Sequence, residues 1–299
     1  MRHTRSPALF ALLLAAALLL AGPAAAKTLE AVASFTVLAD MVRQVGGDRV
    51  HITSLVGPNG DPHAFEPSPD DARALKAADV VFVNGLGLEG WMTRLITASG
   101  FPGKPVVTTQ GLRTRRMEED GKQVTDPHAW NDVASGATYV QNIVKGLSAA
   151  DPEGAASYQA NGARYGDELR QLDAYARQQI ASVPPARRKV LTSHDAFGYF
   201  GASYGVTFLS PVGLSTEGEA SAKEVAALIR QIKAEKVRTY FFENSNDPRL
   251  VRQVANATGA ESGGVLYVEA LSPLNGPAPT YAAMFRYNVD ALVAAMRKN

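Results

Sequence analysis

The chain lacks cysteine altogether, although it is 299 residues long. Without a thiol it cannot form a disulfide, hold a metal through thiolate sulfur or use cysteine as a nucleophile. A lipid cannot be attached through cysteine either, so we expect no lipid anchor and no covalent tether. Any bound metal must be held by imidazole nitrogen and carboxylate oxygen atoms, for which five histidines and 29 acidic residues are available.

An excess of charge of one sign is missing as well, because 30 basic residues stand against 29 acidic ones. The sequence shows no basic stripe interleaved with aromatic residues, the pattern typical of proteins that bind nucleic acid. These observations exclude nucleic acid as the expected partner. We expect a monomer, with enough residues for two ordinary domains.

Long hydrophobic runs are rare, and the one that stands out is Ala8 to Ala21. Arg2 and Arg5 precede it and small residues ending at Ala26 follow it, which is the order typical of a secretory signal peptide. The run is too short to span a bilayer comfortably. We therefore predict a signal peptide over residues 1–26, cleaved after Ala26, and a mature protein located in the periplasm.

Short β-branched runs alternate with helical patterns along most of the remaining chain. The runs that we interpret as strands are Leu29 to Ser34, Val50 to Leu55, Val80 to Val83, Val106 to Thr108, Val190 to Thr192, Val206 to Leu209, Thr239 to Phe242 and Val265 to Val268. Alternation of this kind is typical of parallel sheets flanked by helices. The sequence therefore predicts the α/β class, with two lobes that each hold a mostly parallel sheet flanked by helices.

The middle of the chain carries no strand signal. Apolar residues recur at helical spacing until Pro184-Pro185, which cannot continue a helix. We interpret residues 151–186 as one long rigid linker helix between an N-terminal lobe of residues 27–150 and a C-terminal lobe of residues 187–299. A helix is stiffer than a loop, so ligand binding should involve only a small closure of the lobes.

Three histidines lie in loops that open onto helical patterns. The string Asp-Pro-His-Ala-aromatic occurs twice, placing His63 and His128 at equivalent positions. His63 and His194 follow predicted strands, whereas His128 ends a longer loop. Glu269 comes directly after the last predicted strand. In open α/β sheets ligands bind beyond the carboxyl ends of strands, so these four side chains can converge from two lobes.

Three imidazoles and one carboxylate form a suitable shell for a borderline divalent cation. We therefore predict that His63, His128, His194 and Glu269 hold one metal ion, with Zn²⁺ favoured and Mn²⁺ as the alternative because manganese prefers more oxygen ligands. His51 lies inside a strand pattern, and surface or core packing explains it better.

Three aspartates accompany the candidate histidines in sequence, namely Asp61, Asp126 and Asp195. We predict that they accept hydrogen bonds that orient the imidazoles. A Ser-His-Asp relay is excluded, because Ser193, His194 and Asp195 are adjacent in sequence and their side chains diverge.

Other functions remain open at this stage. Gly85 to Gly90 matches the glycine pattern of dinucleotide sites, but the next strand lacks the acid that would bind the ribose, which favours a tight loop. A zinc-dependent hydrolase with Glu269 as general base is one alternative. A metal-independent adhesin or binder of an organic solute is another.

The motifs resemble those of the metal-specific solute-binding proteins of ABC importers, a family with zinc-binding and manganese-binding members. The likeness covers essentially the whole mature chain. It is carried by Asp61-Pro62-His63 with Phe65-Glu66-Pro67-Ser68, Asp126-Pro127-His128-Ala129-Trp130, Ser193-His194-Asp195-Ala196-Phe197, Glu217 through Ser221-Ala222-Lys223, and Leu266 to Asp290.

The resemblance implies two α/β lobes, a connecting helix and one metal ion in the cleft, which an ABC-type metal permease of the inner membrane receives without any chemistry. The fourth ligand in this family is normally aspartate, so Glu269 is a departure that leaves coordination through one oxygen or two open. Zinc-binding relatives often carry a histidine-rich loop before the second ligand, and Thr114 to Thr125 contains no histidine.

Overall fold

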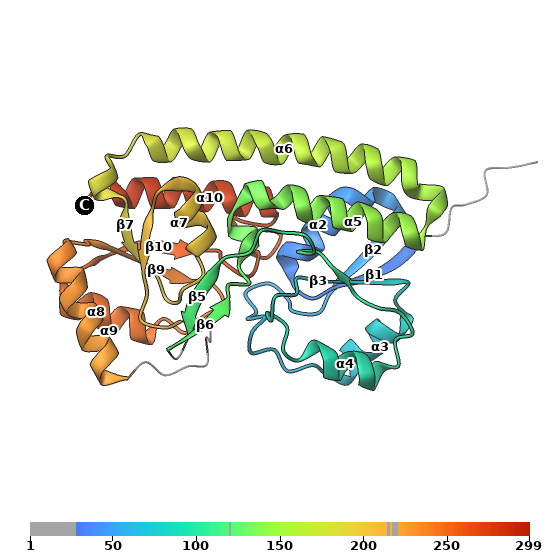
Figure 1. Cartoon of the computed structure of the whole chain (residues 1–299), viewed down its shortest axis with the longest axis horizontal. Coiled ribbons are helices and arrows are strands. Elements are labelled where there is room, and N and C mark those ends of the chain that lie inside the picture. The colour runs from blue at the N-terminus through green and yellow to red at the C-terminus, as the bar shows by residue number, and fades with distance from the viewer. Residues whose placement is uncertain (1–27, 120, 214–215, 217–220) are drawn as a thin grey trace, which may run out of the picture.

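A computed structural model describes residues 28–119, 121–213, 216 and 221–299 of the chain. The predicted signal peptide and Glu217 of the family motif lie outside these residues. Two four-stranded sheets organise the described part (Figure 1), with strand orders β2-β1-β3-β4 and β10-β9-β7-β8. We call the part built on the first sheet the first lobe and the part built on the second sheet the second lobe.

The eight strands of these sheets pair in parallel throughout. Their bounds are β1 (Leu29–Ala33), β2 (Val50–Ser54), β3 (Val80–Val83), β4 (Val106–Val107), β7 (Lys189–Leu191), β8 (Thr207–Leu209), β9 (Thr239–Glu243) and β10 (Glu261–Leu266). Parallel sheets are covered on both faces, and so their central strands are continuous apolar runs, as in the fully buried Val-Val-Phe-Val of β3.

Nine helices surround the sheets within the described ranges. Their bounds are α2 (Thr36–Gly46), α3 (Pro69–Ala77), α4 (Met92–Ser99), α5 (Gly136–Ala150), α6 (Ala155–Ala181), α7 (Gly198–Tyr204), α8 (Ala222–Glu235), α9 (Arg249–Thr258) and α10 (Tyr281–Met296). The predicted start of α3 is present in full, because Ser68 and Asp71 form a reciprocal capping box ahead of it. None of the helices described is both long enough and apolar enough to cross a membrane.

Helix α6 is 27 residues long and runs along one side of both lobes (Figure 1). One face of it is buried, through residues such as Tyr158, Leu169 and Ile180, and it packs on α5, α2 and α10. The predicted fold class, two α/β lobes with a long helix, is therefore confirmed.

The lobes are also joined at their centre by buried hydrogen bonds. The Trp130 indole N–H donates to the carbonyl of Val268 at 2.7 Å, and the Tyr281 hydroxyl donates to the carbonyl of Trp130 at 2.6 Å. Asp40 of α2 accepts the backbone N–H of Tyr281, the first residue of α10, at 2.8 Å. These bonds fix the segment around Trp130 and helix α2 against the segments of the second lobe that contain Val268 and Tyr281.

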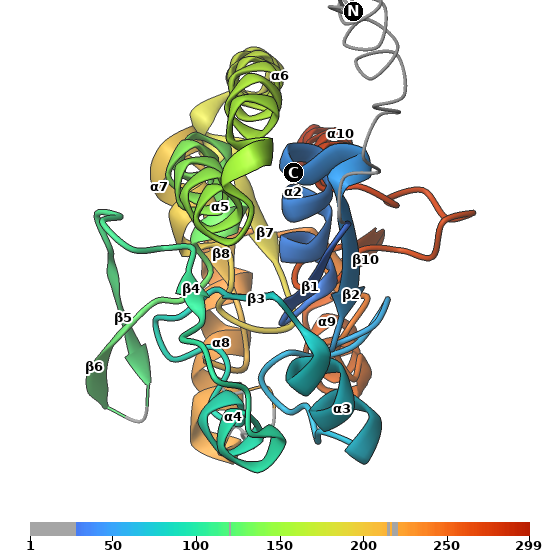
Figure 2. The same cartoon turned by 90° about the vertical axis from the view of Figure 1, so that its right-hand side faces the viewer.

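Two segments differ from the sequence-based expectation. The loop before His128 contains an antiparallel hairpin of β5 (Arg116–Glu119) and β6 (Lys122–Thr125), which stands away from the sheets (Figure 2). The last strand ends at Leu266 and not at Val268. Beyond it, Tyr267 exchanges two hydrogen bonds with the side-chain amide of Asn288 in α10, which replaces pairing along the sheet.

Candidate metal centre

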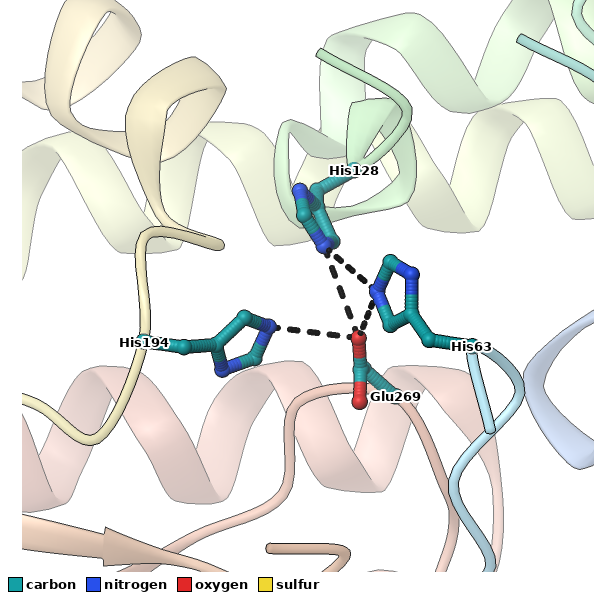
Figure 3. A group of neighbouring side chains, drawn as sticks. All are labelled: His63, His128, His194 and Glu269. Carbon is teal, nitrogen blue, oxygen red and sulfur yellow. Dashed lines mark hydrogen bonds and ion pairs between the residues drawn. The ribbon is translucent and has the colours of Figure 1, made fainter. Parts of the chain in front are cut away.

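Four side chains from four separate loops meet between the lobes. His63 lies between β2 and α3, His128 follows β6, His194 lies between β7 and α7, and Glu269 lies between β10 and α10. Figure 3 shows the three rings and the carboxylate turned toward one common point. The structure therefore brings together all four predicted ligands.

The converging atoms are the Nε2 atoms of the three histidines and Oε1 of Glu269. This oxygen lies 2.6 Å from Nε2 of His63, 3.2 Å from Nε2 of His194 and 3.4 Å from Nε2 of His128. The Nε2 atoms of His63 and His128 are 3.2 Å apart. A tetrahedral ion with metal–ligand distances of about 2.1 Å separates its ligand atoms by about 3.4 Å, and most of these distances are close to that value.

The cluster is closed to solvent except at one residue. The side chains of His128 and Glu269 are 0% exposed and that of His194 is 1% exposed, whereas that of His63 is 10% exposed. Nε2 of His194 and Oε1 of Glu269 are buried without a hydrogen-bond partner. Buried polar atoms normally have partners, so these atoms point to a ligand that binds between them.

Asp126 orients the ring of His128. Its Oδ1 atom lies 2.9 Å from Nδ1 of His128 and accepts the backbone N–H of the same residue at 3.0 Å. With Nδ1 bonded in this way, Nε2 is directed at the cluster. Asp126 thus contacts the ring of His128, and its role in metal binding stays a prediction.

Glu243 takes the corresponding place beside His194, and sequence reasoning missed it. Its Oε2 atom contacts Nδ1 of His194, and its Oε1 atom accepts the backbone N–H groups of Ser193 at 2.8 Å and of His194 at 3.2 Å. The predicted partner, Asp195, does not fill this position. An acid at the carboxyl end of a predicted strand, where ligand loops converge, was the available signal.

Asp61 acts on the backbone of His63, because it accepts the main-chain N–H of that residue at 2.7 Å. The loop of His63 is further fixed by Trp91, whose indole N–H donates to the carbonyl of Pro62 at 2.8 Å and whose ring packs on Phe65 at 4.9 Å. His51 lies away from the cluster on β2, where its ring meets the carboxylate of Glu30 at 2.7 Å.

The side chains of the cluster and their hydrogen-bond partners change one another's pKa values. Burial opposes the charged form of His128, but the hydrogen bond to Asp126 and the nearby carboxylate of Glu269 outweigh it and raise the pKa of the ring. Burial of His194 is likewise outweighed by the charges of Glu243 and Glu269, which raise its pKa well above the usual value.

The pKa of Glu269 shifts in the opposite direction. Burial would raise its pKa, but the charges of His63 and His194 hold the pKa of this carboxyl well below its usual range. These shifts favour an ionised carboxylate and protonated imidazoles when no cation is bound. A divalent cation would replace those protons, because metal ligands must be deprotonated.

Sequence comparison places the chain among proteins of one family. The family model described as zinc-uptake complex component A, periplasmic, matches residues 31–295. The metal ABC transporter substrate-binding lipoprotein SloC of Streptococcus mutans is 30% identical over 275 residues, covering 89% of each protein. The manganese-binding lipoprotein MntA of Bacillus subtilis is 30% identical over 283 residues, covering 93% of this chain and 92% of MntA.

Solved structures agree with this placement. The periplasmic zinc-binding protein TroA of Treponema pallidum superposes with a TM-score of 0.82 at 30% identity, over 90% of this chain and 99% of TroA. Relatives of similar identity are thus named for different metals, so likeness alone does not select between zinc and manganese.

The predicted location, a periplasmic protein without a lipid anchor, is contradicted by these relatives. SloC and MntA are both named as lipoproteins. The expected lack of a lipid anchor rested on the absence of cysteine alone, whereas the expected export rested on the signal-peptide pattern of residues 1–26.

The match of the family model over nearly the whole chain, the relatives and the shared fold lead to one conclusion. The chain belongs to the zinc-uptake component A family of metal-binding, substrate-binding proteins of ABC importers.

Proposed function

We propose that the protein captures one divalent transition-metal ion between its lobes and delivers it to an ABC-type metal permease. His63, His128, His194 and Glu269 are the ligands. The observation that carries this proposal is the convergence of three Nε2 atoms and one carboxylate oxygen, all within 4.8 Å of one another. In the absence of a cation, the buried carboxylate of Glu269 relies on protons of the surrounding imidazoles to balance its charge.

Zinc is the favoured cargo and manganese the alternative. Three imidazoles and one carboxylate in a near-tetrahedral arrangement suit zinc, whereas manganese prefers more oxygen ligands and octahedral geometry. Glu269 supports this assignment, because its Oε1 atom faces the imidazoles while its Oε2 atom accepts the hydroxyl of Ser245 at 3.2 Å. We infer that Glu269 binds through one oxygen.

Transport without catalysis fits the position of Glu269. A general base would have to face a metal-bound water, but its oxygen lies among the imidazole nitrogens at ligand-to-ligand distances. We propose that the protein acts as a monomer, with residues 27–150 and 187–299 as lobes and residues 151–186 between them.

Metal analysis of the untagged protein tests the function. Protein stripped with chelator and dialysed against equal zinc and manganese should retain about one zinc ion per chain and little manganese, as expected from the order of affinities for nitrogen-rich sites. Manganese at one ion per chain would reverse the choice of metal. Failure to retain either ion would refute the function itself.

A further inference from the structure

The carboxylate that orients His128 is itself held by an arginine. Asp126 is 0% exposed, and while its Oδ1 atom serves His128, its Oδ2 atom accepts a hydrogen bond from Nη1 of Arg115 at 2.9 Å. A buried carboxylate is costly unless its charge is balanced and its oxygens are bonded. Arg115 provides both to Asp126.

The main chain fixes the same pair of residues. The backbone N–H of Asp126 donates to the carbonyl of Arg115 at 3.1 Å, directly beside the β5–β6 hairpin. From the second lobe, the hydroxyl of Tyr199 accepts the N–H of Arg115 at 3.1 Å and donates to the carbonyl of Asp126 at 3.0 Å. A helix that follows the His194 loop therefore holds the segment that leads into His128.

A glycine leaves the space that the guanidinium occupies. A Cβ atom at Gly198, the first residue of α7, would lie 1.1 Å from Nη1 of Arg115 and 2.8 Å from Oδ2 of Asp126. Any side chain at this position would displace Arg115 from Asp126. Position 198 therefore requires glycine because of space: even the Cβ atom of alanine would collide with the guanidinium.

The other oriented histidine lacks such a counter-ion. Glu243 beside His194 is bonded by two backbone N–H groups and by the side-chain amide of Asn246 at 2.7 Å. No arginine or lysine forms an ion pair with Glu243 among the residues that the structure describes. Arg115 is therefore specific to the His128 side of the site.

We propose that Arg115 is a positioning residue for metal binding, which holds Asp126 so that His128 presents Nε2 to the metal. The proposal rests on the proposed function, since it concerns affinity for the same ion. Arg115 does not touch the metal; its effect passes through Asp126. Its guanidinium side chain is 36% exposed, so a change there need not disturb the core.

Substitution of Arg115 tests the proposal in the full chain with zinc as the probe. Arg115→Met should weaken zinc binding about tenfold, the lower end of the loss seen when the partners of metal ligands are removed. Arg115→Lys should recover most of that loss, because it retains one charged donor. Arg116→Met is the matched control, since Arg116 lies next in the chain on the exposed hairpin and should leave affinity unchanged.

A double-mutant cycle separates positioning from a general structural role. If Arg115 acts through Asp126, the Arg115→Met/Asp126→Asn protein should bind zinc as Asp126→Asn alone does. In contrast, the losses of zinc affinity caused by Arg115→Met and by Glu243→Gln should multiply when the two substitutions are combined, because they act on different histidines. Multiplicative losses of affinity with Asp126→Asn, or wild-type affinity in Arg115→Met, would overturn the proposal while leaving metal capture intact.

Gly198→Ala gives a second route to the same result without removing a charge. It should reproduce the weaker zinc binding of Arg115→Met. In an Arg115→Met background it should cause a smaller loss of affinity than in the wild type, because only the contact of Cβ with Oδ2 of Asp126 remains. Unfolding temperatures measured in chelator verify that each variant is folded before titration. A Gly198→Ala protein that is folded and binds zinc like the wild type would contradict the spatial argument.

Discussion

The two lobes are built on sheets of the same strand order, since β2-β1-β3-β4 and β8-β7-β9-β10 follow one pattern. Each also carries a glutamate that accepts backbone N–H groups just beyond its central strands. In the first lobe Glu89 accepts those of Asn84 at 2.7 Å and Gly85 at 3.0 Å. In the second lobe Glu243 accepts those of Ser193 and His194.

The two glutamates differ in what else they touch. Glu89 accepts the hydroxyl of Ser34 at 2.6 Å and fixes the loop of Asn84, whose side-chain amide donates to the carbonyl of Pro127 at 3.0 Å. It therefore reaches His128 only through the chain, whereas Glu243 contacts the ring of His194 directly. A buried acid at this position of the fold thus supports loop structure in both lobes. In the second lobe it also contacts a proposed ligand, because a histidine follows the central strand. The carboxylate of Glu89 also occupies the N–H groups that a dinucleotide phosphate would need.

Removal of one ligand from each lobe should produce the largest effect. His128→Ala and His194→Ala should each weaken zinc binding about a hundredfold, because four ligands share an affinity of roughly 10–16 kcal/mol and each contributes about 3 kcal/mol. Competition with a chromophoric chelator measures the dissociation constant. His51→Ala is the control, and it should bind zinc normally. An unchanged constant in either ligand variant would mean that its lobe does not contribute to the site.

Replacement of each glutamate by glutamine should affect zinc affinity to clearly different extents. Glu243→Gln should weaken zinc binding by roughly 10–100-fold, as expected for a group that orients a ligand histidine. Glu89→Gln should weaken zinc binding less than Glu243→Gln, because Glu89 reaches His128 only through Asn84 and Pro127, but it should lower the free energy of unfolding by about 1–3 kcal/mol, because a buried N–H loses its charged acceptor. Chemical denaturation and zinc titration of both variants provide the comparison. Equal zinc affinities in the two variants would refute the distinction.

The sequence predicted the convergence of the four proposed ligands because each of them is marked by a local pattern. The duplicated string identified His63 and His128, and strand-end positions identified His194 and Glu269. Strand positions followed from apolar runs for the same reason, since a buried parallel strand needs side chains that are apolar on both faces.

The partners of the histidines were predicted less well, because hydrogen bonds between distant segments leave no local pattern. Asp126 was found through its position two residues before His128. Glu243 lies 49 residues from His194 and was missed, and Arg115 reaches Asp126 only because Gly198 leaves room for it. The β5–β6 hairpin was also missed, since its strands are short and rich in charge and have only one buried residue.

The smallest difference between the lobes should appear in the pH dependence of binding. The raised pKa values of His128 and His194 mean that the metal-free site binds more protons than the loaded site near neutral pH, so affinity must fall as the pH falls. Each displaced proton should cost about tenfold in apparent affinity per pH unit below the pKa of the metal-free group.

Because the charge of Glu243 leads the causes that raise the pKa of His194, Glu243→Gln should bind zinc with a flatter pH profile than the wild type between about pH 6 and 8. Asp126→Asn should flatten it less, since the pKa of His128 is raised less strongly. Zinc titrations across this range, corrected for protonation of the competing chelator, measure the slopes. A wild-type affinity independent of pH would show that protons do not occupy the site that the metal takes.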